Sequence, residues 1–164
     1  TVAKYLLEFE RGGTAYGPGL EASLTKVRAM AQAEPVGGQA LIEDRGFKAK
    51  LDAAEIEIRA IDATEQRLMS EMSQGQNPGA ASSMVKTLGS EVNQRVSELG
   101  IEAIAHYGFP HQPEARVPGG NVEPIGPDHA VAAMARYLNT RAHSIYAGSN
   151  EIQRNIMAKL VLGL

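Results

Sequence analysis

The feature that most constrains this fold is an apolar stripe that runs through the middle of the 164-residue chain. Apolar residues recur there at steps of mostly four and three, at Phe47, Leu51, Ala54, Ile58, Ile61, Leu68 and Met72. This spacing keeps the apolar side chains on one face of an α-helix and is typical of a helix in an antiparallel bundle. Such a helix must bury its stripe against other elements, so the sequence predicts a packed helical domain.

One charged residue interrupts this stripe, because Glu65 falls between Ile61 and Leu68. Two interpretations are open. In the preferred one, the stripe drifts around the helix and Glu65 reaches solvent at its edge, since a straight helix precesses against a seven-residue repeat. In the other interpretation, Glu65 is a buried carboxylate with a partner on another helix.

Apolar residues at helical spacing predict further helices on both sides of this stripe. They share one face over about residues 17–33 (Leu20, Leu24, Val27 and Ala31), over about 80–107 (Val85, Leu88, Val92, Val96, Leu99 and Ala103) and after Pro127 (Val131, Met134, Leu138, Ala142 and Ile145). A first helix is expected to end near Arg11, and residues 108–126 form a proline-rich connection. No strand alternation is present, so the predicted fold class is all-α: an up-and-down four-helix bundle with additional short helices.

Composition and charge exclude several classes of protein. The formal net charge of −3 argues against a nucleic-acid partner, because phosphate binding relies on clustered Lys and Arg. The chain has no Cys, and none of its His residues stands at the Glu-x-x-His spacing of a di-iron bundle, so no metal site is expected. No apolar run approaches the length of a membrane span, and we expect a cytoplasmic protein.

A turn followed by a helix is predicted near the C-terminus, where Ala147-Gly148-Ser149 precedes apolar residues at helical spacing (Ile152, Ile156 and Leu160). Ser149 suits the N-cap of that helix and Glu151 suits the positive end of its dipole, which explains both residues without any ligand. The same geometry leaves backbone N–H groups pointing outward, a ready site for a phosphate or a carbonyl oxygen. Capping alone leaves both interpretations open.

The stretch from Ser144 to Leu162 closely resembles the C-terminal signature of the acyl-CoA dehydrogenases, and nearly the whole helix pattern resembles the C-terminal helical domain of these flavoenzymes. The resemblance implies that residues 1–164 form one domain of a larger enzyme, whose N-terminal helical domain and β-domain are absent from this chain. It also implies FAD as cofactor, an acyl-CoA as substrate, assembly into a dimer or tetramer, and electron-transferring flavoprotein as the electron acceptor.

The resemblance further implies roles for four residues near the C-terminus. Ala147 and Gly148 are expected to bind the substrate, with the Ala147 N–H bonded to the thioester oxygen, while Ser149 and Glu151 are expected at the FAD. The implied reaction removes a proton α to the thioester carbonyl and passes a hydride from the β-carbon to the flavin. It requires a desolvated carboxylate beside the α-carbon and a polarised carbonyl.

The catalytic base has to come from another position, because many family members carry their glutamate base where this chain has Ala147. In the isovaleryl-CoA dehydrogenases the base belongs to a Glu-Arg pair on the first helix of this domain. Glu10-Arg11, followed by Gly17-Pro18, matches that arrangement in spacing, so Glu10 is the candidate catalytic residue. The alternative for Glu10 is an exposed helix glutamate without a catalytic role. Glu8 is a weaker competitor, because a separation of two residues places it on another side of the helix.

Two departures from the family pattern concern FAD. Residues 34–38 lack the arginine that reaches the neighbouring subunit's FAD in many members, and Glu102 and Ala105-His106 replace the usual glutamine and paired glycines. These losses resemble a bacterial branch that includes heteromeric enzymes. An alternative function therefore stays open, namely a non-catalytic dehydrogenase-like subunit that serves oligomerisation and completes the FAD site of a second dehydrogenase subunit. In either case the chain alone is expected to be inactive.

Overall fold

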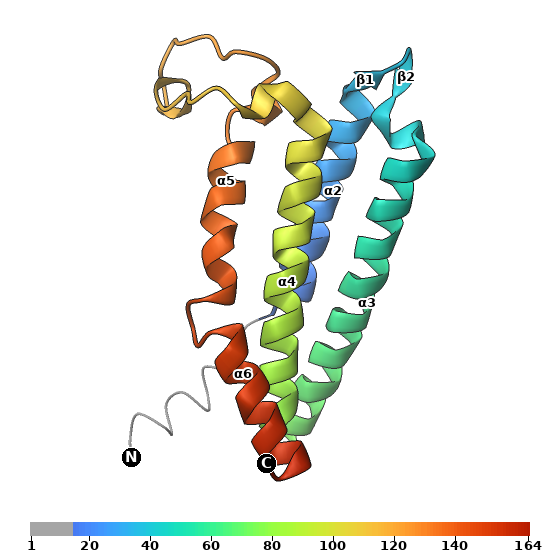
Figure 1. Cartoon of the computed structure of the whole chain (residues 1–164), viewed down its shortest axis with the longest axis vertical. Helices are drawn as coiled ribbons and strands as arrows, with labels where there is room; N and C mark the ends of the chain where they lie inside the picture. Colours follow the sequence, from blue (N-terminus) through green and yellow to red (C-terminus); the bar gives the residue numbers. More distant parts are fainter. Residues whose placement is uncertain (1–14) are drawn as a thin grey trace.

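A computed structural model describes residues 15–164, which form an all-α, up-and-down four-helix bundle with additional short helices (Figure 1). The bundle consists of α2 (Gly17–Ala33), α3 (Arg45–Ser73), α4 (Gly79–Ile104) and α5 (Ala133–Thr140), and α6 (Asn150–Met157) follows at one end. The remaining elements are short: β1 (Pro35–Val36), β2 (Gln39–Ala40), the 3₁₀ helices η1 (Leu41–Glu43), η2 (Ala105–Gly108), η3 (Glu114–Arg116), η4 (Asp128–Ala130) and η5 (Arg141–Ser144), and the π-helical turn η6 (Ala158–Leu162). The helix expected to end near Arg11 lies outside the described residues.

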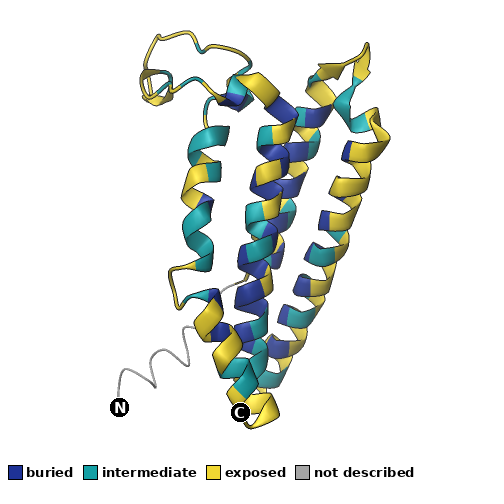
Figure 2. Ribbon diagram, in the orientation of Figure 1, coloured by how far each residue is buried: buried dark blue, intermediate teal, exposed yellow. Residues whose placement is uncertain are grey.

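The apolar stripe of α3 forms one wall of the core. Its residues from Phe47 to Leu68 are buried against α2 and α4, as the dark positions on the inner helix faces show (Figure 2). The helix begins at Asp44, whose carboxylate accepts a hydrogen bond from the backbone N–H of Phe47 at 2.8 Å. This cap satisfies one of the free N–H groups of the first turn and starts the helix in the register that turns its stripe inward.

Glu65 is buried in this wall, with 7% of its surface exposed, so the preferred interpretation of a solvent-reaching edge residue was wrong. Its two carboxylate oxygens accept hydrogen bonds from the backbone N–H groups of Tyr16, at 2.6 Å, and Gly17, at 2.8 Å. No side chain at the start of α2 caps that helix. The Glu65 carboxylate fulfils this role from α3, because the first N–H groups of a helix need acceptors and the N-terminal end of the helix dipole favours a negative charge.

Two of the sequence-based expectations for α4 need correction. The sequence predicts Leu88 on the buried stripe, but 44% of its surface is exposed, while Val85, Val92 and Val96 are buried as expected. Leu88 instead faces the gap between α3 and α4 on the outer side of the core. The helix also stops at Ile104, a few residues before the predicted end, because Ala105 has a φ of +47° and the chain continues as a 3₁₀ turn.

The loop after α2 contains the paired strands β1 and β2, although no strand was predicted from the sequence. The pair is joined by Gly37 and Gly38, with φ values of +60° and +88°. Two consecutive residues with positive φ match the twist of a tight hairpin, and glycine adopts that conformation without a steric penalty. The signal was the Gly-Gly pair itself, but two-residue strands are too short to show alternation.

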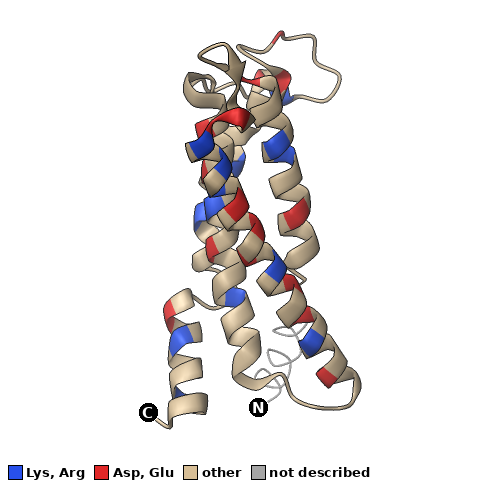
Figure 3. Ribbon diagram, turned by 90° about the vertical axis from the view of Figure 1, so that its right-hand side faces the viewer, with Lys and Arg blue, Asp and Glu red and all other residues tan. Residues whose placement is uncertain are grey.

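The apolar spacing predicted after Pro127 does not mark a single buried helix face. The segment divides into η4, α5 and η5, and Leu138 and Ile145 are exposed, as is Ile152 on α6. On the side drawn in Figure 3, Lys and Arg alternate with Asp and Glu along the helices and do not gather in one patch. Within residues 15–164, no helix combines the length and hydropathy that a bilayer crossing requires.

The cap that α3 provides for α2 can be tested with Glu65→Gln. An amide presents an N–H where Glu65 presents an acceptor, so one of the two buried backbone donors loses its partner. We expect the free energy of unfolding, measured by urea denaturation, to fall by about 2–3 kcal/mol, as for a buried hydrogen bond to a charged group.

The matched control is Glu71→Gln on the same helix. Glu71 makes one ion pair, with Arg67 at 3.8 Å, between half-exposed side chains. Such pairs contribute little to stability, so the free energy of unfolding of this variant should stay close to that of the wild type. Equal losses in the two variants would refute the capping role of Glu65.

Candidate functional site

The face of α4 opposite its apolar stripe is polar, and it binds residues 140–150 near the C-terminus. Five side chains on this polar face of α4 reach toward residues 140–150 across the bundle: Lys86, Ser90, Asn93, Gln94 and Ser97. They recur at helical spacing, so one line of hydrogen bonds runs along the helix and faces the opposite way from its apolar stripe. The polar face of α4 therefore fixes where the chain leaves α5 and where α6 begins.

Gln94 and Asn93 hold the segment that leads into the predicted turn. The side-chain amide of Gln94 donates to the carbonyl oxygens of Thr140 and Arg141 and to the Ser144 hydroxyl, each at 3.2 Å. The Nδ2 atom of Asn93 lies 2.8 Å from the Nδ1 atom of His143. Since these acceptors include the carbonyl of Thr140, the last residue of α5, Gln94 satisfies a group that the end of a helix leaves open.

The turn from Tyr146 to Ser149, hereafter the 146–149 turn, has a strained backbone. Ala147 adopts a φ of +56° and Gly148 a φ of +82°. A left-handed conformation costs a residue with a Cβ roughly 1–2 kcal/mol, and the surrounding contacts maintain it here. Strain of this kind concentrates at functional sites.

Gln153 supplies those contacts from α6. Its side chain is 1% exposed, and its Nε2 donates to the carbonyl oxygens of Ala147, at 3.3 Å, and Gly148, at 3.4 Å. In a planar trans peptide the following N–H points opposite to the C=O. The N–H groups of Gly148 and Ser149 are therefore directed away from Gln153, which gives the 146–149 turn an outer side lined with donors.

The first turn of α6 behaves as the capping interpretation predicts. The Ser149 hydroxyl accepts a hydrogen bond from the Ile152 N–H at 3.5 Å, and Glu151 stands exposed in the first turn. Hydrogen bonds from its own backbone N–H and from the Ser149 side chain lower the pKa of Glu151, with further help from the nearby positive charges of Arg154 and Lys86. Glu151 is thus an ionised carboxylate at the solvent-facing edge of the turn.

Asn150 connects α6 to the polar face of α4. Its side chain is 2% exposed, and its Oδ1 accepts from the Lys86 ammonium at 2.8 Å and from the Ser90 hydroxyl at 3.1 Å. Its Nδ2 lies 3.0 Å from the same hydroxyl and 3.4 Å from a carboxylate oxygen of Glu91. These contacts determine which way the Asn150 amide faces, so the start of α6 is held in one orientation.

The start of α2 meets this site from the other side. The Tyr16 ring lies on Gly89 of α4 so closely that a Cβ on Gly89 would be 2.4 Å from the Tyr16 Cγ. Burial raises the pKa of Tyr16, and the nearby Tyr146 phenol and Glu65 carboxylate raise it further. The chain entering α2 therefore packs closely on α4, within electrostatic range of Tyr146, and glycine at position 89 permits this approach to α4.

The structure brings together four of the five residues singled out from the sequence. Ala147, Gly148, Ser149 and Glu151 lie on one turn and the helix start that follows it. The fifth residue, Glu10, lies outside the described residues.

Sequence reasoning did not identify Lys86, Asn150, Gln153 or Gly89 as parts of this site. A signal for the α4 residues was present, since polar residues recur every three or four positions from Lys86 to Ser97. The stronger apolar stripe on the same helix masks that pattern.

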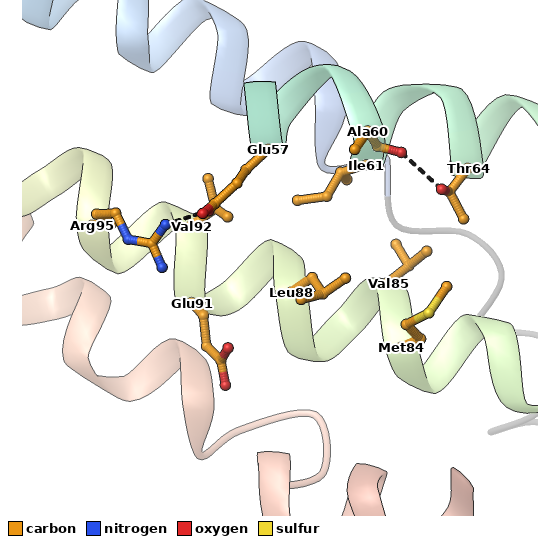
Figure 4. A pocket seen from close by; sticks show the side chains of 10 residues that line it. All are labelled: Glu57, Ala60, Ile61, Thr64, Met84, Val85, Leu88, Glu91, Val92 and Arg95. Atoms are coloured by element: carbon orange, nitrogen blue, oxygen red, sulfur yellow. Dashed lines mark hydrogen bonds and ion pairs between the residues drawn. The ribbon is translucent and has the colours of Figure 1, made fainter. Parts of the chain in front are cut away.

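A separate hollow of about 400 Å³ opens between α3 and α4 (Figure 4). Its lining is mostly apolar and includes Ile61, Val85 and Leu88, while the ion pair of Glu57 with Arg95 lies at its edge. No residue of the 146–149 turn lines it. The hollow therefore does not belong to the donor-lined site at the turn.

Fold and site together define an all-α bundle domain with a strained turn at one end, whose carbonyls are held by a buried amide and whose outer side carries backbone N–H groups. The family model described as "Acyl-CoA dehydrogenase, C-terminal domain" matches residues 1–162. The chain belongs to the acyl-CoA dehydrogenase family, whose C-terminal domain it represents.

Individual relatives agree with this assignment. Over 28 residues, 17% of this chain and 7% of the relative, the sequence is 75% identical to the acyl-CoA dehydrogenase IpdE1 of Mycobacterium tuberculosis. Among solved structures, the ChsE4-ChsE5 complex of Mycobacterium tuberculosis is 26% identical with a TM-score of 0.67, covering 92% of this chain and 36% of the solved one. Butyryl-CoA dehydrogenase of Megasphaera elsdenii shares the fold at 19% identity and a TM-score of 0.72, and the match covers 95% of this chain and 37% of the solved one. The chain thus spans little more than a third of the length of these solved relatives.

The restraint of the 146–149 turn by Gln153 can be tested with Gly148→Ala. A Cβ at position 148 would lie 2.6 Å from the Gln153 Nε2. The alanine would also have to adopt the positive φ of this position. The backbone strain costs about 1–2 kcal/mol, and displacing the buried amide from its carbonyls adds roughly 1–3 kcal/mol. The measurement is the free energy of unfolding from chemical denaturation.

Gly119→Ala provides the control for backbone strain alone. Gly119 has a φ of +77°, but nothing lies within 4 Å of the position its Cβ would take. The free energy of unfolding of this variant should therefore fall only by the cost of backbone strain, about 1–2 kcal/mol. If both variants lost the same stability, Gln153 would not restrain the turn.

Proposed function

We propose that this domain forms the substrate- and flavin-facing half of an FAD-dependent acyl-CoA dehydrogenase, which desaturates an acyl-CoA thioester between its α and β carbons. The observation that carries this proposal is the 146–149 turn, in which the N–H groups of Gly148 and Ser149 point away from the buried Gln153 amide. A donor fixed in this way, here the Gly148 N–H, polarises a thioester carbonyl and stabilises the negative charge that develops on its oxygen.

Residues at the start of α6 suit the flavin. Free N–H groups at a helix N-terminus and the Ser149 hydroxyl provide hydrogen-bond donors and acceptors at one edge of the turn. FAD, when bound there, supplies the acceptor for the hydride that leaves the β-carbon. In this proposal Ala147 and Gly148 contact the thioester, and Ser149 and Glu151 contact the cofactor.

In this proposal Glu10 is the base that removes the α-proton. The electron pair of the broken Cα–H bond moves into the new C=C bond as the β-hydrogen departs with its own pair, and the proton stays on the Glu10 carboxylate. Glu10 precedes Tyr16 by six residues, a span of at most about 22 Å even for extended chain. Because Tyr16 is close enough to Tyr146 for the two phenols to interact electrostatically, this span is compatible with a position of Glu10 beside the substrate carbon.

Glu10→Gln in the full-length enzyme tests this assignment. An amide cannot accept the α-proton, so turnover of acyl-CoA should fall by at least the 10²–10⁴-fold that general base catalysis contributes, roughly, in other enzymes. The flavin absorption spectrum should stay unchanged, since the substitution keeps the size of the side chain. Steady-state kinetics with an electron acceptor and an absorption spectrum are the measurements.

Glu8→Gln is the matched control, because it removes the same charge two positions away. It should retain near-normal turnover. If Glu10→Gln were active and Glu8→Gln inactive, the base would be Glu8, and if both were active it would lie outside this helix.

A second function is favoured by the residues around the end of α4. Glu102 pairs with Lys50 at 2.5 Å, and Ala105 adopts a positive φ, so this corner is occupied by ionic and backbone interactions of the domain itself. One solved relative is the ChsE4-ChsE5 complex. In this alternative, the chain belongs to a non-catalytic subunit that completes the FAD site of a second dehydrogenase subunit. Copurification of the full-length protein with a second dehydrogenase, with flavin retained only by the pair, would support it.

We also expect the 164-residue chain alone to neither retain FAD nor oxidise an acyl-CoA, because both ligands would be enclosed on one side only. Gel filtration after incubation with FAD, followed by the visible spectrum of the protein peak, measures retention. A yellow protein peak that passes electrons from acyl-CoA to electron-transferring flavoprotein or a dye would contradict this expectation.

A further inference from the structure

We propose that Lys86 is the positioning residue of the 146–149 turn, acting through Asn150 and through its own positive charge to stabilise negative charge on the bound thioester. This inference rests on the proposed function and adds to it a residue to which neither the reaction nor the capping of α6 assigns a role. The inference derives from the position of the buried Lys86 ammonium, which reaches from α4 to the first residue of α6.

Lys86 is buried within the bundle rather than on its surface. Only 9% of it is exposed, and its ammonium donates to the Asn150 Oδ1 at 2.8 Å. Asn150 is the residue directly after the Ser149 cap, and it is itself 2% exposed. The ammonium therefore stands behind the first turn of α6, on the inner side of the turn whose outer side carries the free N–H groups.

This placement is unfavourable for stability alone. A cation stabilises the C-terminal end of a helix and destabilises the N-terminal end, where Lys86 lies relative to α6. Burial also opposes the charge, and it lowers the pKa of Lys86. A buried charge that breaks a local rule at a candidate site calls for a compensating function.

The neighbouring groups leave the positive charge only partly balanced. Glu151 on α6 offsets it in part, from an exposed position. Glu91 on α4 lies beside Asn150, but its carboxylate is paired with Arg154. On the other side stands His143, whose pKa is lowered by burial and by the positive charges of Lys86, Arg136 and Arg141. On the inner side of the turn, these carboxylates thus offset the positive charge of Lys86 only in part.

Two effects on the substrate follow. The hydrogen bond from Lys86 keeps the Asn150 amide in one orientation, which fixes the start of α6 and with it the donors of the turn. The charge also raises the electrostatic potential at the thioester oxygen, where negative charge develops once the α-proton leaves. Both effects favour the enolate over the neutral thioester, so they act on turnover more than on binding.

The experiment uses the full-length flavoenzyme and a 3-thiaacyl-CoA. This thioester can lose its α-proton but offers no β-hydride, so its enolate accumulates beside the oxidised flavin as a long-wavelength absorption. Titrating that absorption against pH gives the pKa of the bound α-proton. Lys86→Met should raise this pKa by about one unit, a tenfold effect, below the roughly 10²–10³-fold cost of removing a direct donor to an oxyanion.

Three companion variants separate charge, hydrogen bond and fold. Lys86→Arg keeps the charge and should restore enolate formation. Lys86→Gln keeps a donor for Asn150 without the charge and serves if the Met variant does not fold, with the same direction of shift expected. Lys48→Met removes an exposed lysine of α3 and should leave the α-proton pKa unchanged.

The outcomes distinguish this inference from the proposed function. If the wild-type enzyme forms no enolate and does not oxidise acyl-CoA, the proposed function fails. If it does both and Lys86→Met matches it in α-proton pKa and in kcat, the role of Lys86 is refuted. A loss of thermal stability in Lys86→Met and Lys86→Gln, with kcat and the α-proton pKa unchanged, would likewise overturn it in favour of a structural lysine.

Discussion

The rest of this structure depends on one helix that buries two chemically different faces. The apolar face of α4 packs against α2 and α3 and completes the core, while the polar face of α4 binds the chain from Thr140 to Asn150. Apolar packing sets how α4 sits in the bundle. Hydrogen bonds on the polar face then fix the strained turn relative to α4, because each buried polar group needs its partner in place.

The same logic joins the two ends of the described chain. The Glu65 carboxylate caps α2 from α3, and Gly89 lets the Tyr16 ring approach α4. The start of α2 and the 146–149 turn thereby come together, although they are separated by more than a hundred residues of sequence. The site is thus positioned by buried polar contacts between helices, on a frame that the apolar core makes rigid.

These polar contacts are also where function and stability diverge. Gln153 holds two carbonyls of a turn with positive φ values, and Lys86 places a charge at the less favourable end of α6. A core optimised for stability alone would avoid both arrangements. Both side chains act on one turn, behind its outward N–H groups, and this is the structural argument for the proposal that this end of the bundle faces the substrate.

The sequence alone determined the elements that follow from local periodicity and local capping. The α3 stripe, the bounds of α2 and the Ser149 cap all follow from residues close together in the chain, and the family signature after Ser144 follows from the sequence itself. Only the tertiary structure decided that Glu65 is buried, that Leu88 is not, and that Lys86 reaches Asn150. The last of these contacts spans 64 residues and the Glu65 contacts 48 and 49. Whether a polar side chain is buried with a partner depends on which helix faces meet, and that is a property of the packed bundle rather than of any single segment.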